Sequence, residues 1–468
     1  MAISPARAAA FDVLLRVEHG AYAVELLHSE RLEELVAADL GLATEIVMGV
    51  ERWRSRLDAA LSENLSVAIA KLDPEVLLAL RMGAYQLMFL ERVPAHASIN
   101  ESVELVKRAR KRSAAGLVNA VLRKIAAART VSRGGQILSS AGRGTGSGLP
   151  LRAAVEGKFD ARELARTFAH PEWLVERWSA NYGPEHARLI CEFGQQVPEA
   201  VLRLPDKPEA AAEIEHELGA KGIELAPGRL MRSARRVVSG DVTKCLAVAE
   251  RRAAIQDEAS QLVAALVVRG RRILDCCAAP GGKTAAIADS NPDSQIVAVD
   301  VHEHRVRLLR KLVAKPNVSC LHDDIRHMPR AKLFDRVLVD APCSGTGTLG
   351  RNPEIKWRIQ PSDLSDLQAR QQEILAAAAG HLEPGGRLIY ATCSLEPEEG
   401  EQVVARLLDH HTDLKLLEMA TELEELRKAG ALSWPDIVSL VHGSFLRTVP
   451  GLHPCDGFFA AVLVRPAD

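Results

Sequence analysis

The sequence lacks any apolar stretch of the ~18 residues that a membrane-spanning helix requires, so we do not expect an integral membrane protein. Its first residues carry Arg7, Asp12 and Arg16 where a secretion signal has an unbroken apolar region. Its 8 cysteines in 468 residues are too few for a disulfide framework, and none belongs to a C-x-x-C pair, so a zinc site is not expected. These absences predict a reduced, cytoplasmic, globular protein without a metal.

Neither aromatic side chains nor charges of one sign are abundant. Aromatic residues make up 4% of the chain, so broad base stacking is not expected. Trp357, Phe458 and Phe459 either stack on a base or pack in a core. The 59 Lys and Arg nearly balance 61 Asp and Glu, giving a net charge of −2, which does not indicate a uniformly basic nucleic-acid binder.

The basic residues are nevertheless unevenly distributed. The basic window, residues 105–155, contains no Asp or Glu and includes Lys107, Arg108, Arg110, Lys111, Arg112, Arg123, Lys124, Arg129, Arg133, Arg143 and Arg152. A second cluster follows at Arg229, Arg232, Arg235 and Arg236. Two interpretations stay open, a solvated helix face with a tail or a surface that contacts phosphates.

The length of the chain is typical of two to four domains. Apolar residues at helical spacing predict an all-α domain over 1–130, and the Gly- and Ser-rich composition of 131–155 predicts a linker. Residues 156–255 mix helix and strand patterns and are predicted to form a small α/β module that binds RNA. Residues 256–468 are predicted to form the catalytic domain.

From about residue 270 short apolar runs alternate with helical stretches. Continuous apolar strands between helices indicate an α/β domain with a mostly parallel sheet covered on both faces. Ligands of such sheets bind at the carboxyl ends of the strands. The runs are RRILDCC, IVAVDV, VSCLHDD, FDRVLVDA, GRLIYATC and FFAAVLVR.

Two glycine patterns in this region resemble phosphate-binding loops. The turn after the first run ends in Gly-Lys-Thr, but a Walker A loop needs glycine where this chain has Cys277. The run from Gly345 to Gly350 matches G-x-G-x-x-G, yet Arg351-Asn352-Pro353 follows it instead of a helix. A P-loop NTPase is therefore a disfavoured alternative.

Carboxylates follow the second and third runs. Asp300 stands 18 residues after Gly282, where a carboxylate suits the two hydroxyls of a ribose. Asp323 and Asp324 follow the third run, and either can accept a hydrogen bond from an adenine amino group or cap a helix.

Two cysteines follow the fourth and fifth runs, Cys343 after Asp340 and Cys393 after Thr392. A thiolate is both a good nucleophile and a good leaving group. Cytosine chemistry at C5 needs both properties, because C5 becomes nucleophilic only after addition at C6. Asp340, if protonated, can assist the addition at N3.

Five segments together resemble the RNA cytosine-5 methyltransferase family of Sun/Fmu, Nol1 and Nop2: LDCCAAPGGKT, DAPCSGTG, RNPEIKW, YATCSLEPEE and DGFF. In the N-terminal part, AFDVLLRVEHGAYA, LRMGAYQLMFL, ASINESVELVK and GLVNAVLRKI resemble the RNA-binding domain of NusB. This fusion implies an enzyme that methylates one cytosine of bacterial 16S rRNA, free or within a small-subunit particle.

The resemblance implies a role for each matching residue. Cys393 is the nucleophile, Cys343 assists proton removal or release, and Asp340 contacts the cytosine and the cofactor. Asp300 binds the ribose of S-adenosylmethionine and Asp324 its adenine, while Lys283 lies near the site. The turn after the first run holds the methionine part through backbone N–H groups; this turn comprises Ala278, Ala279, Pro280, Gly281, Gly282 and Lys283. The enzyme is expected to be a monomer, and a non-catalytic rRNA-binding or assembly factor remains the alternative.

Overall fold

The structure is a computed structural model that describes residues 3–29, 32, 34–132, 160–330 and 333–467. Its contacts divide the chain into two compact units. The helical unit comprises Met1–Gln196 together with Leu349–Arg358, and the sheet unit comprises Val197–Thr348 with Ile359–Asp468. Among the described residues no helix is both long and apolar enough to cross a bilayer.

The helical unit contains the all-α region that the sequence predicts. Helix α5 (Pro74–Phe89) is buried at every position from Leu78 to Leu87, whereas α6 (Ala95–Arg108) buries Ile99, Ser102 and Val106 at three- and four-residue spacing. Gly49 of α4 lets the ring of Tyr85 pack against the helix backbone, since a Cβ there would lie 1.9 Å from Tyr85 Cζ. The helices are α1 (Pro5–Glu18), α2 (Ala23–Leu27), α4 (Ala37–Ser62), α5 (Pro74–Phe89), α6 (Ala95–Arg108), α7 (Ala115–Ser132), α8 (Ala161–Thr167), α9 (Glu172–Tyr182), α10 (Pro184–Gln195) and α16 (Ile355–Arg358).

The domain boundaries at 130, 155 and 255 stay predictions. Residues 131 and 132 continue helix α7, and the rest of the predicted linker, 133–155, lies outside the described residues. The contacts group α8–α10 with the helical unit and the strands after residue 200 with the sheet unit.

The 349–358 segment, which carries the RNPEIKW sequence, packs within the helical unit. Arg358 donates to the carbonyl oxygen of Val17 at 2.7 Å, and the indole N–H of Trp357 donates to that of Glu51 at 2.6 Å. Lys356 is buried, and its ammonium donates to the Arg52 carbonyl oxygen at 3.0 Å. Trp357 is thus held by the helical unit rather than offered to a base.

Glu51, beside this segment, is fully buried, and burial raises its pKa to about 7. Because the folded state binds this proton more tightly than the unfolded chain does, folding stability falls as pH rises from about 4.5 through 7. We expect the difference in unfolding free energy between Glu51→Gln and the wild type to increase in favour of the variant by roughly 3 kcal/mol from pH 5 to pH 8. Denaturant titrations at both pH values measure the gain. Glu63→Gln, exposed at the end of the same helix, is the control, and an equal gain there would contradict the assignment.

The sheet unit begins with a small antiparallel sheet in the order β2-β3-β1-β4. Helix α11 packs on it through Ile214 and Leu218, which join a core with Leu202. The elements are β1 (Val201–Arg203), α11 (Pro208–Ala220), β2 (Glu224–Pro227), β3 (Ala234–Ser239), α12 (Leu246–Ala249) and β4 (Ala254–Ile255).

The large sheet follows the order β11-β12-β13-β9-β8-β5-β6-β7, with β10 paired to β13. Strands β9, β8, β5, β6 and β7 are parallel, and β13 and its further neighbours are antiparallel. The predicted mostly parallel sheet is confirmed, and the run FFAAVLVR is its antiparallel β13. The strands are β5 (Arg272–Cys276), β6 (Gln295–Asp300), β7 (Val318–His322), β8 (Phe334–Asp340), β9 (Leu382–Thr392), β10 (Lys415–Leu416), β11 (Val441–His442), β12 (Phe445–Thr448) and β13 (Phe458–Val464).

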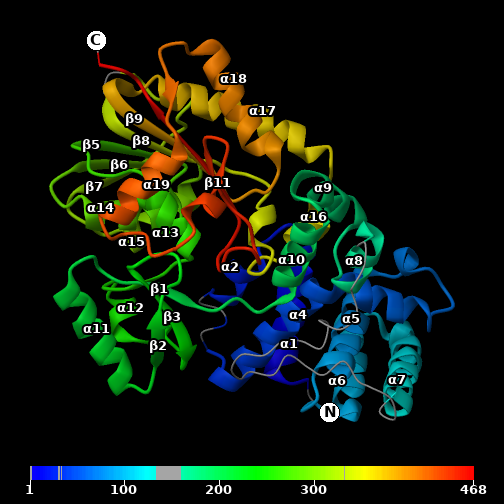
Figure 1. Cartoon of the computed structure of the whole chain (residues 1–468). Helices are drawn as coiled ribbons and strands as arrows, with labels where there is room; N and C mark the ends of the chain where they lie inside the picture. The colour runs from blue at the N-terminus through cyan, green and yellow to red at the C-terminus, as the bar shows by residue number, and fades with distance from the viewer. Residues whose placement is uncertain (1–2, 30–31, 33, 133–159, 331–332, 468) are drawn as a thin grey trace. The chain divides into compact units, whose positions relative to one another are not determined.

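Helices cover both faces of this sheet (Figure 1). Successive strand residues point to opposite faces, so Leu338 packs with α13, α14 and α19, and Val339 with α17 and α18. This arrangement places the carboxyl ends of β5, β6, β8 and β9 at one edge. The helices are α13 (Glu258–Ala265), α14 (Gly282–Ser290), α15 (Glu303–Leu312), α17 (Asp363–Ala379), α18 (Glu401–His410) and α19 (Met419–Lys428).

Candidate active site

The cysteine pair, Cys343 and Cys393, lies at this edge of the sheet. Cys343 comes just after β8 and Cys393 just after β9, and these strands are parallel neighbours with Asp340 opposite Ala391. The two Sγ atoms are 3.3 Å apart. Both thiols are partly exposed. The sequence placed the two cysteines on adjacent strand ends, and the structure brings them into contact.

The pKa of Cys343 is raised well above its ordinary value. Its hydrogen bond with Cys393 is the largest cause, followed by burial and by the negative charges of Cys393 and Glu399. The raised pKa favours the thiol form of Cys343.

Lys283 lies at the same edge, at the start of α14. Its ammonium donates to Asp340 Oδ2 at 2.7 Å and sits 4.9 Å from the ring centre of Phe458. Burial lowers the pKa of Lys283, but the charge and hydrogen bond of Asp340, with a further contribution from Cys393, outweigh it and raise that pKa. Asp340 is thus paired with a cation, which differs from the expectation of a lone protonated carboxyl.

The turn after β5 has the shape of a ligand-binding turn. Gly281 has φ +114°, in the left-handed region, and α14 begins at the next residue. The first N–H groups of a helix have no partner within it. The N–H of Ala278 donates to Val299 O at 2.8 Å and that of Ala279 to Asp300 Oδ2 at 3.3 Å, and proline has no N–H. Of the run 278–283, Gly281, Gly282 and Lys283 therefore remain as the candidates that offer an N–H group to a ligand.

Asp275, the penultimate residue of β5, was quoted in the sequence motif without a role. It is buried, its Oδ2 accepts from Thr284 Oγ1 at 2.6 Å, and its Oδ1 has no hydrogen-bond partner among the described residues. Burial raises its pKa to about 7. A buried carboxylate oxygen without a donor fits a ligand that brings one, such as the amino group of an amino acid.

Asp300 and Asp324 follow the next two strands as predicted. Asp300 is 3% exposed and accepts from the His302 N–H at 3.0 Å. Asp324 accepts hydrogen bonds from Nε and Nη2 of the Arg326 guanidinium, which lowers the pKa of that carboxyl. Asp323 accepts from the Asp324 N–H at 2.8 Å. Together with Asp275 and the helix start, these carboxylates fit a nucleoside joined to an amino acid.

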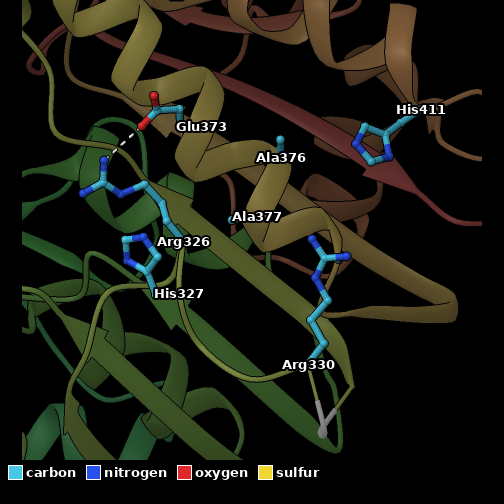
Figure 2. A pocket seen from close by; sticks show the side chains of 8 residues that line it. Arg326, His327, Arg330, Glu373, Ala376, Ala377 and His411 are labelled. Carbon is cyan, nitrogen blue, oxygen red and sulfur yellow. Dashed lines mark hydrogen bonds and ion pairs between the residues drawn. The ribbon is translucent and has the colours of Figure 1, made fainter.

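A separate hollow of about 470 Å³ lies on the outer side of α17 (Figure 2). Arg326 donates to Glu373 there at 2.9 Å, and Arg330 lies against Gly380, where α17 ends and a cation is favoured by the helix dipole. None of the predicted catalytic or cofactor residues lines this hollow. The lining residues are Arg326, His327, Arg330, Glu373, Ala376, Ala377, Gly380 and His411.

The basic window is partly neutralised in the helical unit. Lys107 pairs with Glu104, Arg108 with Asp12, and Lys111 with Asp73. Exposed Arg112, Arg123 and Lys124 have no ion pair with a described carboxylate, and so they keep the charge that a phosphate would meet. In the second cluster, Arg235 pairs with Glu215, and Arg229 and Arg236 with Glu199.

The aromatic alternatives are resolved toward packing. Phe459 is 0% exposed and Phe458 5%, on β13. Both rings belong to the apolar cores on the two faces of the sheet.

Comparisons with known proteins agree with this architecture from end to end. A protein of Bacillus subtilis described as probable ribosomal RNA small subunit methyltransferase B is 31% identical over 462 residues, which cover 96% of each chain. The chain belongs to the RsmB family of 16S rRNA methyltransferases. The resemblance that the sequence motifs carried is thereby confirmed, and the chain is a methyltransferase.

Family models match the parts of this RsmB-family chain separately. The model of the 16S rRNA methyltransferase RsmB/F matches residues 265–464, the NusB family model residues 4–127, and a ferredoxin-like domain model of RsmF/B-like methyltransferases residues 170–241. Ribosomal RNA small subunit methyltransferase B of Pseudomonas putida is 32% identical, covering 98% of both chains. The crystal structure of PH0851 aligns with a TM-score of 0.76 at 22% identity over 99% of each chain, which supports the fold.

Proposed function

We propose that this methyltransferase transfers a methyl group from S-adenosylmethionine to C5 of one cytosine in 16S rRNA, with Cys393 as the nucleophile. The observation that supports this most is the cysteine pair, with two thiols 3.3 Å apart beside the Lys283–Asp340 ion pair. Relatives over the full chain are described as small-subunit rRNA methyltransferases, which supports the choice of substrate.

The chemistry of cytosine assigns the two cysteines different tasks. The Cys393 thiolate adds to C6, and the electrons of the C5–C6 double bond make C5 nucleophilic. S-adenosylmethionine, when bound, supplies the electrophilic methyl group. The C5 proton then leaves and the S–C6 bond breaks. Cys343, a thiol 3.3 Å away, gives its proton to the Cys393 sulfur as the S–C6 bond breaks, and the Cys343 thiolate formed in this way accepts the proton that leaves C5.

The base is oriented by the Lys283–Asp340 pair. The ammonium offers a charged N–H to the acceptors at N3 and O2 of cytosine, and the carboxylate accepts from the exocyclic amino group. We infer that the pair, rather than a protonated Asp340 alone, supports addition at C6.

The cofactor would be held by the turn after β5 and the neighbouring strand ends. Asp275 and the N–H groups of Gly281–Lys283 would bind the methionine part, Asp300 the ribose hydroxyls and Asp324 the adenine amino group. Asp340 lies at the same edge through its bond to Lys283.

Bisulfite sequencing of 16S rRNA from a strain without this gene tests the proposal. We expect one cytosine to lose its methyl group, a plasmid copy to restore it and a Cys393→Ala copy not to. Full methylation without the gene would overturn the proposal. Restoration of the methyl group by the Cys393→Ala copy would overturn the assignment of Cys393 as the nucleophile.

RNA binding by the helical unit is tested by charge removal rather than deletion, because this unit holds the 349–358 segment. We expect the triple change Arg112→Gln, Arg123→Gln and Lys124→Gln to weaken rRNA binding and lower the slope of log affinity against log salt by about 2. Filter binding at several salt concentrations measures both. Lys107→Gln, whose charge is already paired with Glu104, is the control. An unchanged slope in the triple variant would place the RNA surface elsewhere.

A further inference from the structure

Glu399 is a buried carboxylate that the chemistry above does not use. It ends the short helix Pro397–Glu399 after β9, and its side chain is 0% exposed. It is the last residue of the YATCSLEPEE segment, which also contains Cys393. A carboxylate this deep is costly unless hydrogen bonds compensate its charge.

The donors to this carboxylate come from both cysteine turns. Oε1 accepts the backbone N–H of Ser344, the residue after Cys343, at 2.8 Å. Oε2 accepts the Ser344 hydroxyl and, at 2.5 Å, the hydroxyl of Ser394, the residue after Cys393. One carboxylate therefore bonds the residue that follows each cysteine.

Two other side chains extend the same network. Gln371 of α17 donates to Glu399 Oε1 and to the carbonyl oxygen of Pro342, the residue before Cys343, both at 2.9 Å. The Tyr390 hydroxyl, on β9, donates to the Glu399 carbonyl oxygen at 2.8 Å. The donors to the carboxylate are a backbone N–H, a side-chain amide and two hydroxyls. All four are neutral, so directed hydrogen bonds rather than a counter-ion stabilise the negative charge.

We propose that Glu399 is a positioning residue that sets the separation of the two catalytic thiols by binding both cysteine turns to one carboxylate. Bonds to a charged acceptor are shorter and stronger than those between neutral groups, so the carboxylate adds a stronger link to the neutral bonds that also join the turns, Gly347 N–H to the Cys393 carbonyl oxygen at 2.9 Å and the Ser344 and Ser394 hydroxyls at 3.1 Å. The negative charge of Glu399 also contributes to the raised pKa of Cys343, which keeps the helper in its thiol form. The catalytic consequence rests on the proposed function; the geometric one does not.

The geometric consequence is tested without any methyl transfer. A trivalent aryl arsenical, phenylarsine oxide, binds tightly only where two thiols reach one arsenic atom, and the cysteine pair at 3.3 Å provides that. We expect Glu399→Gln and Glu399→Ala to weaken its binding at least tenfold. Cys343→Ser removes the pair and defines the background from other cysteines. Glu398→Gln, a neighbour in sequence and only partly buried, is the matched control and should bind as the wild type does.

The catalytic consequence is tested by kinetics on the same variants. We expect Glu399→Gln to lower kcat about 10- to 100-fold while KM for RNA and for S-adenosylmethionine changes less than threefold, since Glu399 touches neither. Glu399→Asp, which keeps the charge on a shorter stem, should recover part of the loss. A general loss of folding would instead lower the melting temperature and the fraction of the enzyme that binds S-adenosylmethionine, which a titration of binding sites measures.

Each outcome decides between the alternatives. If Glu399→Gln does not fold, Ser394→Ala removes a single donor from the Cys393 turn and should weaken arsenical binding on its own. Unchanged arsenical binding and kcat in the folded variants would overturn the proposal. Weakened arsenical binding in the Glu399 variants, together with a wild-type enzyme that methylates no RNA, would leave the positioning role standing and remove the proposed function.

Discussion

Cys393→Ala is expected to abolish methyl transfer, lowering the rate by a factor on the order of 10³ or more, while the affinity for S-adenosylmethionine stays nearly unchanged. The methyl side chain cannot add to C6, so C5 never becomes nucleophilic. The predicted cofactor residues lie at or just after the ends of β5, β6, β7 and β8, so the loss of a thiol after β9 leaves them in place. A filter assay with radiolabelled cofactor measures the rate, and isothermal titration measures the affinity.

The design of this experiment needs a cysteine that takes no part in the reaction. Cys320 on β7 is also partly exposed, so Cys320→Ala controls for the loss of an accessible thiol and should keep full activity. Residual activity of Cys393→Ala above one tenth of the wild type would show that another group adds to C6. An equal loss in Cys320→Ala would show that the assay reports thiol damage rather than nucleophilic catalysis.

The strand ends could be predicted from the sequence because parallel strands that follow one another through helices share one orientation. That rule placed Asp300, Asp340, Cys343 and Cys393 at one edge without knowledge of any distance. The order of the strands across the sheet, in contrast, depends on contacts between residues that are distant in the sequence. Since β5 lies between β6 and β8 in the sheet, only the structure reveals that Lys283 after β5 reaches Asp340 at the end of β8.

Other features were out of reach for a different reason. The roles of Asp275 and Glu399 depend on contacts that the sequence does not show. Asp275 has a buried oxygen without a hydrogen-bond partner among the described residues. Glu399 bonds the two cysteine turns, which are distant from each other in the sequence. The net charge of −2 concealed the basic window, and the window in turn did not reveal that Lys107, Arg108 and Lys111 are paired. The contacts of the 349–358 segment with helices far earlier in the chain also produce no periodic pattern in the sequence from which they could be predicted.

Cys343→Ala is expected to have the opposite signature to Cys393→Ala, because it should accumulate a covalent RNA–protein adduct. Cys393 still adds to C6 and C5 still receives its methyl group, but no thiol stands 3.3 Å from the Cys393 sulfur to return a proton as the S–C6 bond breaks. Turnover stops after one methyl transfer per enzyme. On a denaturing gel with labelled rRNA we expect a shifted band that carries both protein and RNA.

The nature of that band discriminates between the roles of the two cysteines. A thioether to C6 survives a reducing agent, whereas a disulfide between Cys393 and another protein does not. The double variant Cys343→Ala with Cys393→Ala must lose the band, since no nucleophile remains. A shifted band in the double variant would place the covalent bond on another residue. Steady turnover by Cys343→Ala without any band would show that release needs no second thiol, and the raised pKa of Cys343 would then be a by-product of its contact with Cys393.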